Sequence, residues 1–560
     1  MTEGRGLRIE AAGVSQWVRG GRHTLTDVSL TIEPGELVAI VGGSGTGKTT
    51  LLDALAGIRP AAAGVVRYDR PLSFGYVPQD DIIHLELPLA RTLRYAARLR
   101  LPKGTTEATL DAAVRDVLQA LDLAGRADVR VGALSGGQRK RASIAVELLT
   151  SPGVFFLDEP TSGLDPARAA EFMRLLRRLA DGGTTVVLAT HHPPDVRKCD
   201  KIAFLAGDGR LAFFGPPAAA CAFFETDDIE EIYELLAGDD TAREWGERFA
   251  AGRADAPAAT PQSSVAESSA AAGGRMIGAI GQWSLLTRRN LDILVRNRLT
   301  VALLAGSPVM VLLMFAVLFR PGAFDPTQPS PNATVMILFW VAFGGFFFGL
   351  TYGLLQICTE FAIVRRERLA GLGVGPYVLA KATVLLPLLA VVDLLTLAVL
   401  RALDRLPAAD AATYGELFVT LLLSSAAALA LGLLTSAAVA DPAQAAIALP
   451  MLCFPQVLFV GAILPVPVMA VAGRVLSYPM SNRWAFEGLG HSLDVASLWA
   501  RGGSPLGPPL LASYGDTFSR PLLADWAILA GFAVAFLVAA GLVLGRKAPA
   551  QQRSRGASPV

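Results

Sequence analysis

The pattern of apolar and polar positions divides the chain into a first part of short alternating elements and a second part of long apolar runs. Residues 7–32 alternate between apolar and polar in the manner of strands. The segments 36–41, 154–160 and 184–192 each contain a short apolar run typical of a buried strand. Because helical spacing separates these strands, we expect an α/β domain with a mainly parallel sheet. The predicted helices are 48–56, 89–99, 109–121 and 167–180.

From Val301 onward the apolar runs are long enough to cross a bilayer, which takes about 20 residues as a helix. Asp393 is the one charge within them. Basic residues cluster before the first run, between the second and third, and after the last, so the positive-inside rule predicts a multi-pass membrane protein with both termini cytoplasmic. The six predicted spans are 301–319, 333–359, 382–400, 417–440, 443–464 and 526–545.

The segments around the spans have compositions of their own. Small, polar and proline-bearing residues predict a flexible low-complexity linker over 237–275. Residues 276–298 combine apolar spacing with four arginines, as in an amphipathic helix at a membrane surface. We therefore expect a first domain at 1–236, a membrane domain at 299–546 with an irregular external segment at about 466–524, and a cytoplasmic tail at 547–560.

Overall composition adds few constraints. Of 560 residues, 52% are hydrophobic and 18% charged, and the net charge of +1 gives no reason to expect a nucleic-acid partner. The four cysteines are scattered without CxxC spacing, so we expect buried thiols rather than a zinc site or a disulfide framework. The first residues have no apolar run after a basic start, which predicts no cleaved signal peptide and a first domain that stays in the cytoplasm.

The segment GGSGTGKT, 42–49, matches the phosphate-loop pattern GxxxxGK[ST] between a predicted strand and a predicted helix. Its glycines let backbone N–H groups surround phosphates, Lys48 adds a positive charge, and Thr49 offers a hydroxyl to Mg²⁺. The alternative, a chance glycine turn, does not explain why strand, spacing and helix agree. The predicted ATP-binding residues of this loop are Gly42, Gly43, Ser44, Gly45, Thr46, Gly47, Lys48, Thr49 and Thr50.

VFFLDEP, 154–160, supplies the acidic partners of that loop. Asp158 at the strand end suits the Mg²⁺ shell, and Glu159 suits a base that orients and deprotonates a water attacking the γ-phosphate. An acidic strand end that merely faces solvent is the alternative for an isolated motif of this kind.

Four further motifs lie in order with these two: VPQDD (77–81), LSGGQ (134–138), SGLD (162–165) and LATHH (188–192). Together they resemble the nucleotide-binding domain of ABC transporters. VPQDD, the RKR that follows the signature, and an ATPase domain ahead of six spans more narrowly resemble half-transporters of the G subfamily, the white or breast-cancer-resistance type. The resemblance implies a RecA-like core with a β-subdomain and a helical subdomain, fused to an all-α six-span transmembrane domain of the type-2 exporter class.

The resemblance also implies roles for individual residues. Gln79 is expected to contact Mg²⁺, together with Thr49 and Asp158, and to sense the membrane domain. Glu159 is the expected general base, and His191, rather than His192, the expected contact to the γ-phosphate.

The signature and the residues after the second acidic motif are expected to act across a dimer. Ser135, Gly136, Gly137 and Gln138 are expected to bind the ATP of a second subunit, and Asp165 to bridge the two ATPase domains. Glycines that permit close approach, a serine hydroxyl and a helix that begins near Gln138 suit this half of a phosphate site. Trp17 either stacks on adenine or is a core residue.

Within the membrane domain the polar residues have two interpretations. Asp393, Gln356 and Glu360 either face a cavity or, as we prefer, form structural pairs between helices, for example Glu360 or Asp393 with a basic residue at a span end. The phenylalanines at 339, 343, 346 and 347 line a cavity, face lipid or pack against neighbours. Two segments also have two interpretations: the helix at 276–298 and FAIVRRERLAGLG. They either couple the ATPase domain to the spans or anchor the spans at the membrane interface.

These patterns predict an ATP- and Mg²⁺-dependent exporter of the inner or plasma membrane. It would work with a second copy of itself, or with a related half-transporter, on a hydrophobic or amphipathic substrate such as a lipid, glycolipid or drug-like compound. The alternative is a membrane-bound ABC ATPase that transmits force or a signal to a partner without transport. The resemblance to the G subfamily disfavours an importer, and the spans and the single ATPase domain exclude a soluble translation factor.

Overall fold

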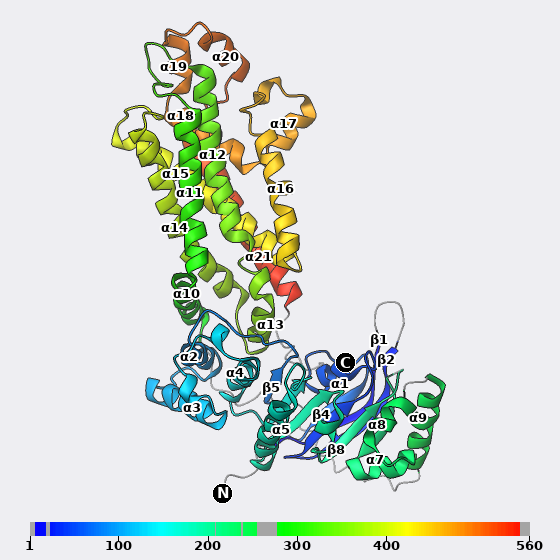
Figure 1. The fold of residues 1–560 in the computed structure, drawn as a ribbon. Helices are drawn as coiled ribbons and strands as arrows, with labels where there is room; N and C mark the ends of the chain where they lie inside the picture. The colour runs from blue at the N-terminus through cyan, green and yellow to red at the C-terminus, as the bar shows by residue number, and fades with distance from the viewer. Residues whose placement is uncertain (1–5, 18–22, 208, 237–238, 255–276, 549–560) are drawn as a thin grey trace, which may run out of the picture. The chain divides into compact units, whose positions relative to one another are not determined.

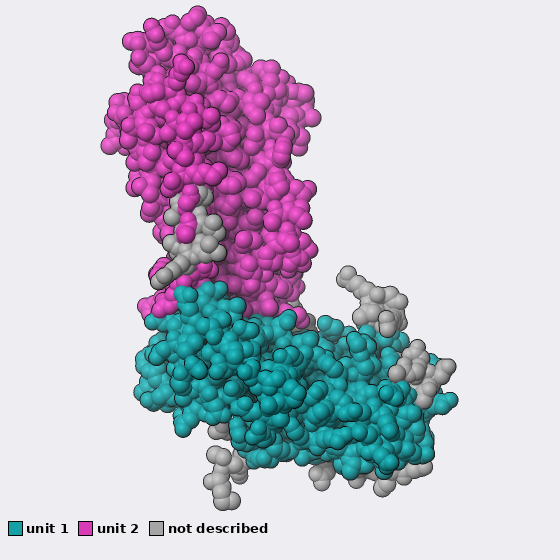
Figure 2. Space-filling view, in the orientation of Figure 1, with its two compact units in different colours: residues 1–277, 551–560 teal, residues 278–550 magenta. Residues whose placement is uncertain are grey.

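The structure is a computed structural model that describes residues 6–17, 23–207, 209–236, 239–254 and 277–548. The chain forms two compact units, one up to Ile277 and one from Gly278 to Ala550 (Figures 1 and 2). The first unit contains all the strands of the described residues, and the second is helical.

The first unit is built on two sheets. A six-stranded sheet has the order β5-β6-β7-β3-β8-β9 and is parallel except for β9, which runs antiparallel to β8. A three-stranded antiparallel sheet has the order β2-β1-β4. The strands are β1 (Ile9–Trp17), β2 (His23–Ile32), β3 (Leu37–Val41), β4 (Ala63–Tyr68), β5 (Phe74–Val77), β6 (Val154–Asp158), β7 (Thr185–Thr190), β8 (Lys201–Leu205) and β9 (Leu211–Gly215).

The central strands of the large sheet are buried on both faces, which is why they appear in the sequence as continuous apolar runs. Every residue of β3, β6 and β7 is buried. Alternate residues of β3 pack on opposite faces of the sheet. Val38 and Ile40 pack with the apolar side of α1, whereas Leu37 and Ala39 pack with the layer that contains α5. The carboxyl ends of β3 and β6 therefore lie close together, separated only by β7.

Helices cover this sheet. In addition, α2, α3 and α4 form a separate helical part of the same unit (Figure 1). A buried ion pair ties α2 to α4, because both terminal nitrogens of Arg100 donate to Glu147, at 2.6 and 2.8 Å. The helices of this unit are α1 (Lys48–Leu55), α2 (Leu89–Arg100), α3 (Glu107–Ala120), α4 (Gly136–Leu148), α5 (Pro166–Asp181), α6 (Pro193–Val196), α7 (Pro217–Phe224), α8 (Ile229–Leu235) and α9 (Asp239–Ala254).

Helix α9 corrects the predicted linker, which was expected to begin at residue 237. Trp245 and Phe249 are four residues apart and lie on one face of the helix, where they pack against Phe213 and Phe223. The aromatic cluster stabilises residues that the small, polar composition assigned to a linker. The remainder of the predicted linker, 255–276, lies outside the described residues.

The second unit contains four helices that are long and apolar enough to cross a membrane by length and composition: Pro331–Leu369, Val374–Ala402, Ala411–Ala438 and Leu522–Lys547. Two shorter apolar helices, Pro308–Leu318 and Pro442–Leu458, coincide with parts of the first and fifth predicted spans. The predicted fifth span was too long, since its helix ends at Leu458, and Gly461 has a left-handed backbone with a φ of 99°. Pro450 and Pro455 lie inside this helix and each removes a backbone donor.

The helices of this unit, with two short 3₁₀ turns, follow in chain order. They are α10 (Ala279–Arg296), α11 (Arg298–Leu318), α12 (Pro331–Leu354), η3 (Cys358–Glu360), α13 (Phe361–Leu369), α14 (Val374–Ala402), α15 (Ala411–Ala438), α16 (Pro442–Leu458), η4 (Val466–Val468), α17 (Val471–Ser477), α18 (Ser481–Ser492), α19 (Val495–Arg501), α20 (Gly507–Tyr514) and α21 (Leu522–Lys547).

The segment predicted as an irregular external stretch, 466–524, is instead folded into four short helices, α17 to α20. Trp499, Tyr514 and Phe518 stack around a common centre with ring centroids 5.3 to 5.7 Å apart. Ten of the twelve residues of α18 are buried. The prolines and glycines that suggested irregular structure lie mainly at helix ends, whereas widely spaced aromatic residues provide the core.

Helices α12 and α15 approach each other closely because glycine replaces side chains along their contact. A Cβ on Gly349 would lie 2.3 Å from the carbonyl oxygen of Ser425, and one on Gly432 would lie 2.5 Å from that of Leu350. Either distance is below any real contact, so this packing requires glycine.

Candidate functional site

The phosphate loop follows β3 and ends at the first turn of α1. Gly47 caps this helix with a φ of 95°, and a Cβ there would lie 2.3 Å from the carbonyl oxygen of Thr24, so only glycine fits. Backbone carbonyl groups of the loop bind the side chain of its lysine: Lys48 Nζ donates to the carbonyl oxygens of Gly42 at 3.0 Å and Gly43 at 2.7 Å. Burial lowers the pKa of Lys48, against the opposing effect of the carboxylates Glu159 and Asp158.

Thr49 and Asp158 come from α1 and β6 and meet at the carboxyl edge of the sheet. Thr49 Oγ1 donates to Asp158 Oδ1 at 3.2 Å and to Oδ2 at 3.0 Å. Burial raises the pKa of Asp158, although the hydrogen bond from Thr49 opposes the shift. A hydroxyl and a carboxylate side by side are hard oxygen donors, the kind that Mg²⁺ takes together with phosphate oxygens.

Glu159 is the next residue, and three contacts fix its orientation. Its backbone has a φ of 44°, which is uncommon for a residue with a side chain, and its N–H donates to the carbonyl oxygen of Ala189 at 2.9 Å. Gln79 Nε2 donates to Glu159 Oε2 at 3.1 Å, and His191 Nδ1 lies 3.0 Å from Oε1. Two residues from separate motifs, Gln79 and His191, therefore converge on one carboxylate. Gln79 contacts this carboxylate rather than the Thr49–Asp158 pair that was expected to share Mg²⁺ with it.

Lys140 is a site residue whose contact sequence reasoning missed. It is buried on α4, two residues after the signature, and its Nζ donates to the carbonyl oxygens of Pro78 at 3.1 Å and Gln79 at 2.6 Å. Burial lowers the pKa of this amine, and Asp81 is the largest opposing charge. Lys140 thus attaches the backbone beside Gln79 to the signature helix. The RKR pattern was visible in the sequence, but the carbonyls that Lys140 contacts lie about 60 positions earlier in the chain.

The signature forms the start of α4 with a capping box. Gln138 N–H donates to Ser135 Oγ at 3.4 Å, and Ser135 N–H donates to Gln138 Oε1 at 3.1 Å. The helix begins at Gly136, two residues before the position near Gln138 that the sequence suggested. Gln138 therefore has a structural role at the start of this helix, which fixes the orientation of the first N–H groups.

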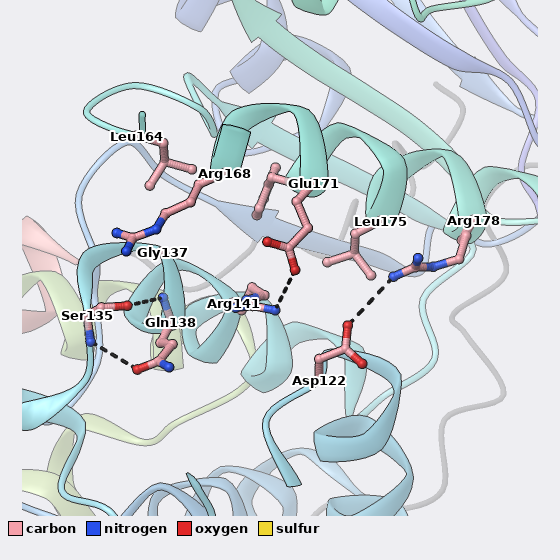
Figure 3. Close-up of a pocket in the computed structure, with 11 residues that line it drawn as sticks. Asp122, Ser135, Gly137, Gln138, Arg141, Leu164, Arg168, Glu171, Leu175 and Arg178 are labelled. Atoms are coloured by element: carbon pink, nitrogen blue, oxygen red, sulfur yellow. Dashed lines mark hydrogen bonds and ion pairs between the residues drawn. The ribbon is translucent and has the colours of Figure 1, made fainter. Parts of the chain in front are cut away.

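A hollow between α4 and α5 begins at the signature (Figure 3). Asp165 caps α5 there, accepting from the N–H of Arg168 at 3.0 Å. The hollow is lined by Asp122, Ser135, Gly137, Gln138, Arg141, Leu164, Arg168, Glu171, Phe172, Leu175 and Arg178. The signature thus lines a hollow that does not include Lys48, Asp158 or Glu159.

Trp17 lies at the end of β1 with 44% of its surface exposed, and its ring meets His23 edge-on at 5.8 Å. The interpretation as a core residue is therefore wrong. Adenine stacking stays a prediction, as do the ATP contacts of Ser44, Gly45, Thr46 and Thr50.

The polar residues of the membrane unit form pairs within it. Lys381 Nζ donates to Glu360 Oε2 at 2.8 Å, and the hydroxyl of Tyr377 donates to the same oxygen at 3.2 Å, which is the structural pair expected for Glu360. Asp393 does not pair with a basic residue but accepts from Ser425 Oγ at 3.2 Å. Gln356, two residues after the end of α12, donates to the carbonyl oxygen of Tyr352 in the last turn of that helix at 3.0 Å.

The phenylalanines of α12 pack against one another. The ring of Phe343 lies 5.9 Å from that of Phe339, 6.2 Å from that of Phe346 and 6.0 Å from that of Phe347, measured between centroids. Phe339 and Phe346 are buried, so this face contributes to the core of the unit.

A second connection joins α10 to α13, the two segments expected to couple or anchor the spans. Arg289 Nη1 and Nη2 donate to the two carboxylate oxygens of Glu367 at 2.5 and 3.0 Å, and both residues are buried. The interpretation of α10 as a surface-lying amphipathic helix is thus incomplete, because this arginine faces protein.

Comparisons with known proteins agree with this arrangement. Residues 25–162 match the family model described as ABC transporter, and residues 281–493 match ABC-2 type transporter. An ABC transporter ATP-binding/permease protein of Mycobacterium tuberculosis is 33% identical over 88% of this chain and 58% of its own length. The chain therefore spans a little more than half of that relative.

Two relatives from eukaryotes are also similar. ABC transporter G family member 7 of Arabidopsis thaliana is 30% identical over 84% of this chain and 70% of its own length. The broad substrate specificity ATP-binding cassette transporter ABCG2 of Sus scrofa is 38% identical over 36% of this chain and 33% of its own length. The predicted fold class and subfamily are confirmed: the chain belongs to the G family of ABC transporters, with an ABC ATPase domain followed by an ABC-2 membrane domain.

Proposed function

We propose that this protein is an ATP-hydrolysing exporter that works as a dimer of half-transporters, most simply a homodimer, with two ATP sites between the subunits. Its substrate is hydrophobic or amphipathic, such as a lipid, a glycolipid or a drug-like compound. The proposal places the protein in the inner or plasma membrane with the ATPase domain and both termini in the cytoplasm. The observation that carries the proposal is the convergence of Gln79 and His191 on Glu159, next to the Thr49–Asp158 pair.

In this proposal the residues of one subunit bind ATP and prepare the attacking water. Backbone N–H groups of 42–49 and the amine of Lys48 bind the phosphates, after Lys48 releases the carbonyls of Gly42 and Gly43. Thr49 and Asp158 hold Mg²⁺, which neutralises charge on the β- and γ-phosphates when it is bound. Glu159 accepts the proton of the water, and His191, already beside it, stabilises the γ-phosphate.

The signature of the second subunit completes the site. The capping box leaves the N-terminal end of α4 directed outward, where its partial positive charge suits a phosphate. Gly137 permits close approach, since the atoms nearest to an added Cβ are side-chain atoms at 3.7 Å. Lys140 then connects this signature helix to the backbone beside Gln79, so that occupancy of one site influences the orientation of Glu159 in the other.

The decisive experiment compares Glu159→Gln with the wild-type protein in lipid vesicles. We expect ATP hydrolysis to fall by about 10²- to 10⁴-fold, the range for loss of a general base, while ATP stays bound. Glu225→Gln is the matched control, because Glu225 shares the left-handed backbone with a φ of 58° but is exposed and far from the site in sequence. Wild-type-like hydrolysis by Glu159→Gln would show that Glu159 is not the base.

Export is tested in cells that carry the same two proteins. We expect the lipid composition of the membrane leaflets or of the medium to differ between wild-type and Glu159→Gln cells, because only the wild type completes the cycle. An unchanged lipid profile, with both proteins inserted at equal level, contradicts a lipid substrate and favours the alternative in which the spans transmit force to a partner.

A further inference from the structure

Arg168 lies directly beside the signature, on the neighbouring helix. The atom nearest to an added Cβ on Gly137 is Arg168 Cδ, at 3.7 Å. Figure 3 shows the guanidinium of Arg168 over the first turn of α4, next to Gly137, and both residues line the same hollow as Ser135 and Gln138. This positive charge thus stands at the end of the hollow where the signature N–H groups begin.

Asp165 holds the stem of Arg168 in this position. Its Oδ1 accepts from the backbone N–H of Arg168 at 3.0 Å, and its Oδ2 lies 3.2 Å from Arg168 Nε. The contact uses the inner nitrogen of the guanidinium. The two terminal nitrogens form the planar fork that matches two phosphate oxygens, a geometry that lysine does not offer.

The other arginines of the hollow are held by carboxylates within it. Arg141 Nη1 lies 3.4 Å from Glu171 Oε1, and Arg178 Nη2 lies 4.0 Å from Asp122 Oδ2. Arg168 and Arg178 are both exposed, with 56% and 61% of their side chains accessible, but Arg168 is the one that points toward the signature. The arginine nearest to the signature is thus the one placed to meet an anion that arrives there.

We propose that Arg168 is a further ATP-contacting residue, which acts in trans: its guanidinium binds the γ-phosphate of the ATP held by the phosphate loop of the partner subunit. This proposal rests on the dimeric ATPase proposed above. When Asp165 turns to the partner subunit, Arg168 loses its tether and the fork donates to the γ-phosphoryl oxygens. As charge spreads over those oxygens in the transition state, the guanidinium neutralises part of it.

The first test measures steady-state hydrolysis by the full-length protein in lipid vesicles. For Arg168→Gln we expect kcat to fall by about 100-fold, as when one preorganised donor to a developing oxyanion is removed. Binding of ATP to the phosphate loop of the same chain should stay within about threefold. Arg168→Lys keeps the charge without the fork and should retain an intermediate rate.

Arg174→Gln is the matched control, since Arg174 is exposed on the same helix, donates to the carbonyl oxygen of Ala170 at 3.4 Å and does not line the hollow. It should hydrolyse ATP like the wild type. A wild-type rate for Arg168→Gln, or an equal loss for Arg174→Gln, overturns the proposal.

The second test distinguishes action in trans from a local structural role. Mixed dimers are purified with two different affinity tags, and Lys48→Ala inactivates one phosphate loop. With Lys48→Ala on one subunit and Arg168→Gln on the other, one complete site remains if Arg168 acts in trans, and hydrolysis should match a dimer of Lys48→Ala with wild type. With both substitutions on one subunit and a wild-type partner, no complete site remains and hydrolysis should fall to background.

The reverse result, with activity only when both substitutions share a subunit, shows that Arg168 acts on the ATP of its own chain and overturns the proposal. Equal activity in the two arrangements overturns it as well. The reference dimer of Lys48→Ala with wild type separates this inference from the proposed function. If the reference dimer hydrolyses ATP, the dimeric ATPase is supported even when the result for Arg168 overturns the inference. If both the reference dimer and the wild type are inactive, the dimeric ATPase itself is contradicted.

Discussion

At the scale of the residue, Asp158 shows how a functional position opposes stability. Its carboxyl group is 7% exposed, next to Glu159 and close to Asp53, and burial raises its pKa. The hydrogen bond from Thr49 and the charges of Lys48 and Lys140 favour its ionised form. Without a ligand, a carboxylate in this position therefore lowers stability at a pH where it is ionised.

This gives a pH-dependent prediction for Asp158→Asn. Because the pKa of Asp158 is raised in the folded state, the native protein binds more protons than the unfolded chain at pH values between the ordinary carboxyl pKa and the raised one. The stability that this group contributes is therefore present in acid and is lost as the pH rises through that window. Asparagine keeps an acceptor for Thr49 but carries no charge. We expect the variant, measured without Mg²⁺ or ATP, to melt a few degrees above the wild type at neutral pH and at the same temperature in acid.

The measurement is the thermal unfolding of both proteins from acid to neutral pH, followed by the same series with Mg²⁺ and ATP. In the second series the wild type should gain more than the variant, because the proposed Mg²⁺ site then keeps its charged ligand. A variant that is less stable than the wild type at neutral pH without ligand would contradict the interpretation.

At the scale of the element, α10 and α13 are joined by the buried pair of Arg289 and Glu367. Removing one member leaves a buried charge without its principal partner, which typically costs about 3–5 kcal/mol, whereas replacing both by apolar residues is often close to neutral. The pair therefore contributes more to the specific attachment of α10 to α13 than to net stability.

The corresponding prediction is a double-mutant cycle. Arg289→Met should lower the free energy of unfolding by about 3 kcal/mol or more, and the double variant Arg289→Met, Glu367→Met should recover most of that loss. Arg288→Met, at the exposed neighbouring position, should have little effect. Thermal unfolding in detergent compares the wild type, the single variants Arg289→Met and Glu367→Met, the double variant and Arg288→Met. Additive losses for the two single variants would show that Arg289 and Glu367 do not interact.

Helices α12 and α15 depend on glycine in a position-specific way. A Cβ on Gly349 would meet the Ser425 carbonyl oxygen at 2.3 Å, whereas one on Gly344 of the same helix has nothing within 4 Å. We expect Gly349→Val to force the two helices apart, at a cost of at least about 2 kcal/mol, and to reduce the amount of folded protein in the membrane. Gly344→Val has the same helix propensity and should accumulate normally; equal loss in both variants would attribute the effect to valine itself.

At the scale of the whole molecule, the signature and the phosphate loop of one chain are separate groups of contacts, and a second subunit is proposed to bring complementary halves together. Gly137→Asp tests this. The nearest atoms to an added Cβ are the side chains of Arg168 and Leu164 at 3.7 Å, and an acidic residue in the first turn of α4 suits the helix dipole, so folding should persist.

The new carboxylate would stand against the γ-phosphate of the partner's ATP, so hydrolysis should fall by about 100-fold or more while each phosphate loop still binds ATP. Equilibrium binding of a fluorescent ATP analogue and the rate of phosphate release measure the two effects separately. Loss of nucleotide binding in Gly137→Asp would show that the signature contributes to the site of its own chain.

Much of this protein was predictable because its decisive patterns are local. The phosphate loop, the acidic strand end and the signature each occupy a few consecutive residues. Buried parallel strands are visible in the sequence as apolar runs. The spacing of Trp245 and Phe249 also indicates helix α9. The polar composition of the residues that follow led instead to the prediction of a linker. The same reliance on composition missed the helices of 466–524, where Trp499 packs on Tyr514 and Phe518, which lie more than ten positions later in the chain.

Residue types at fixed short spacing were enough to establish the fold class and the family, and to predict which groups surround ATP. Only the tertiary structure decided which distant groups meet: Lys140 with the carbonyls beside Gln79, Arg289 with Glu367, and Arg168 with the start of the signature helix. The physical reason is that a charge or a donor in the sequence does not specify its partner. Chain topology brings the partners together, and burial then makes a specific hydrogen bond or ion pair obligatory.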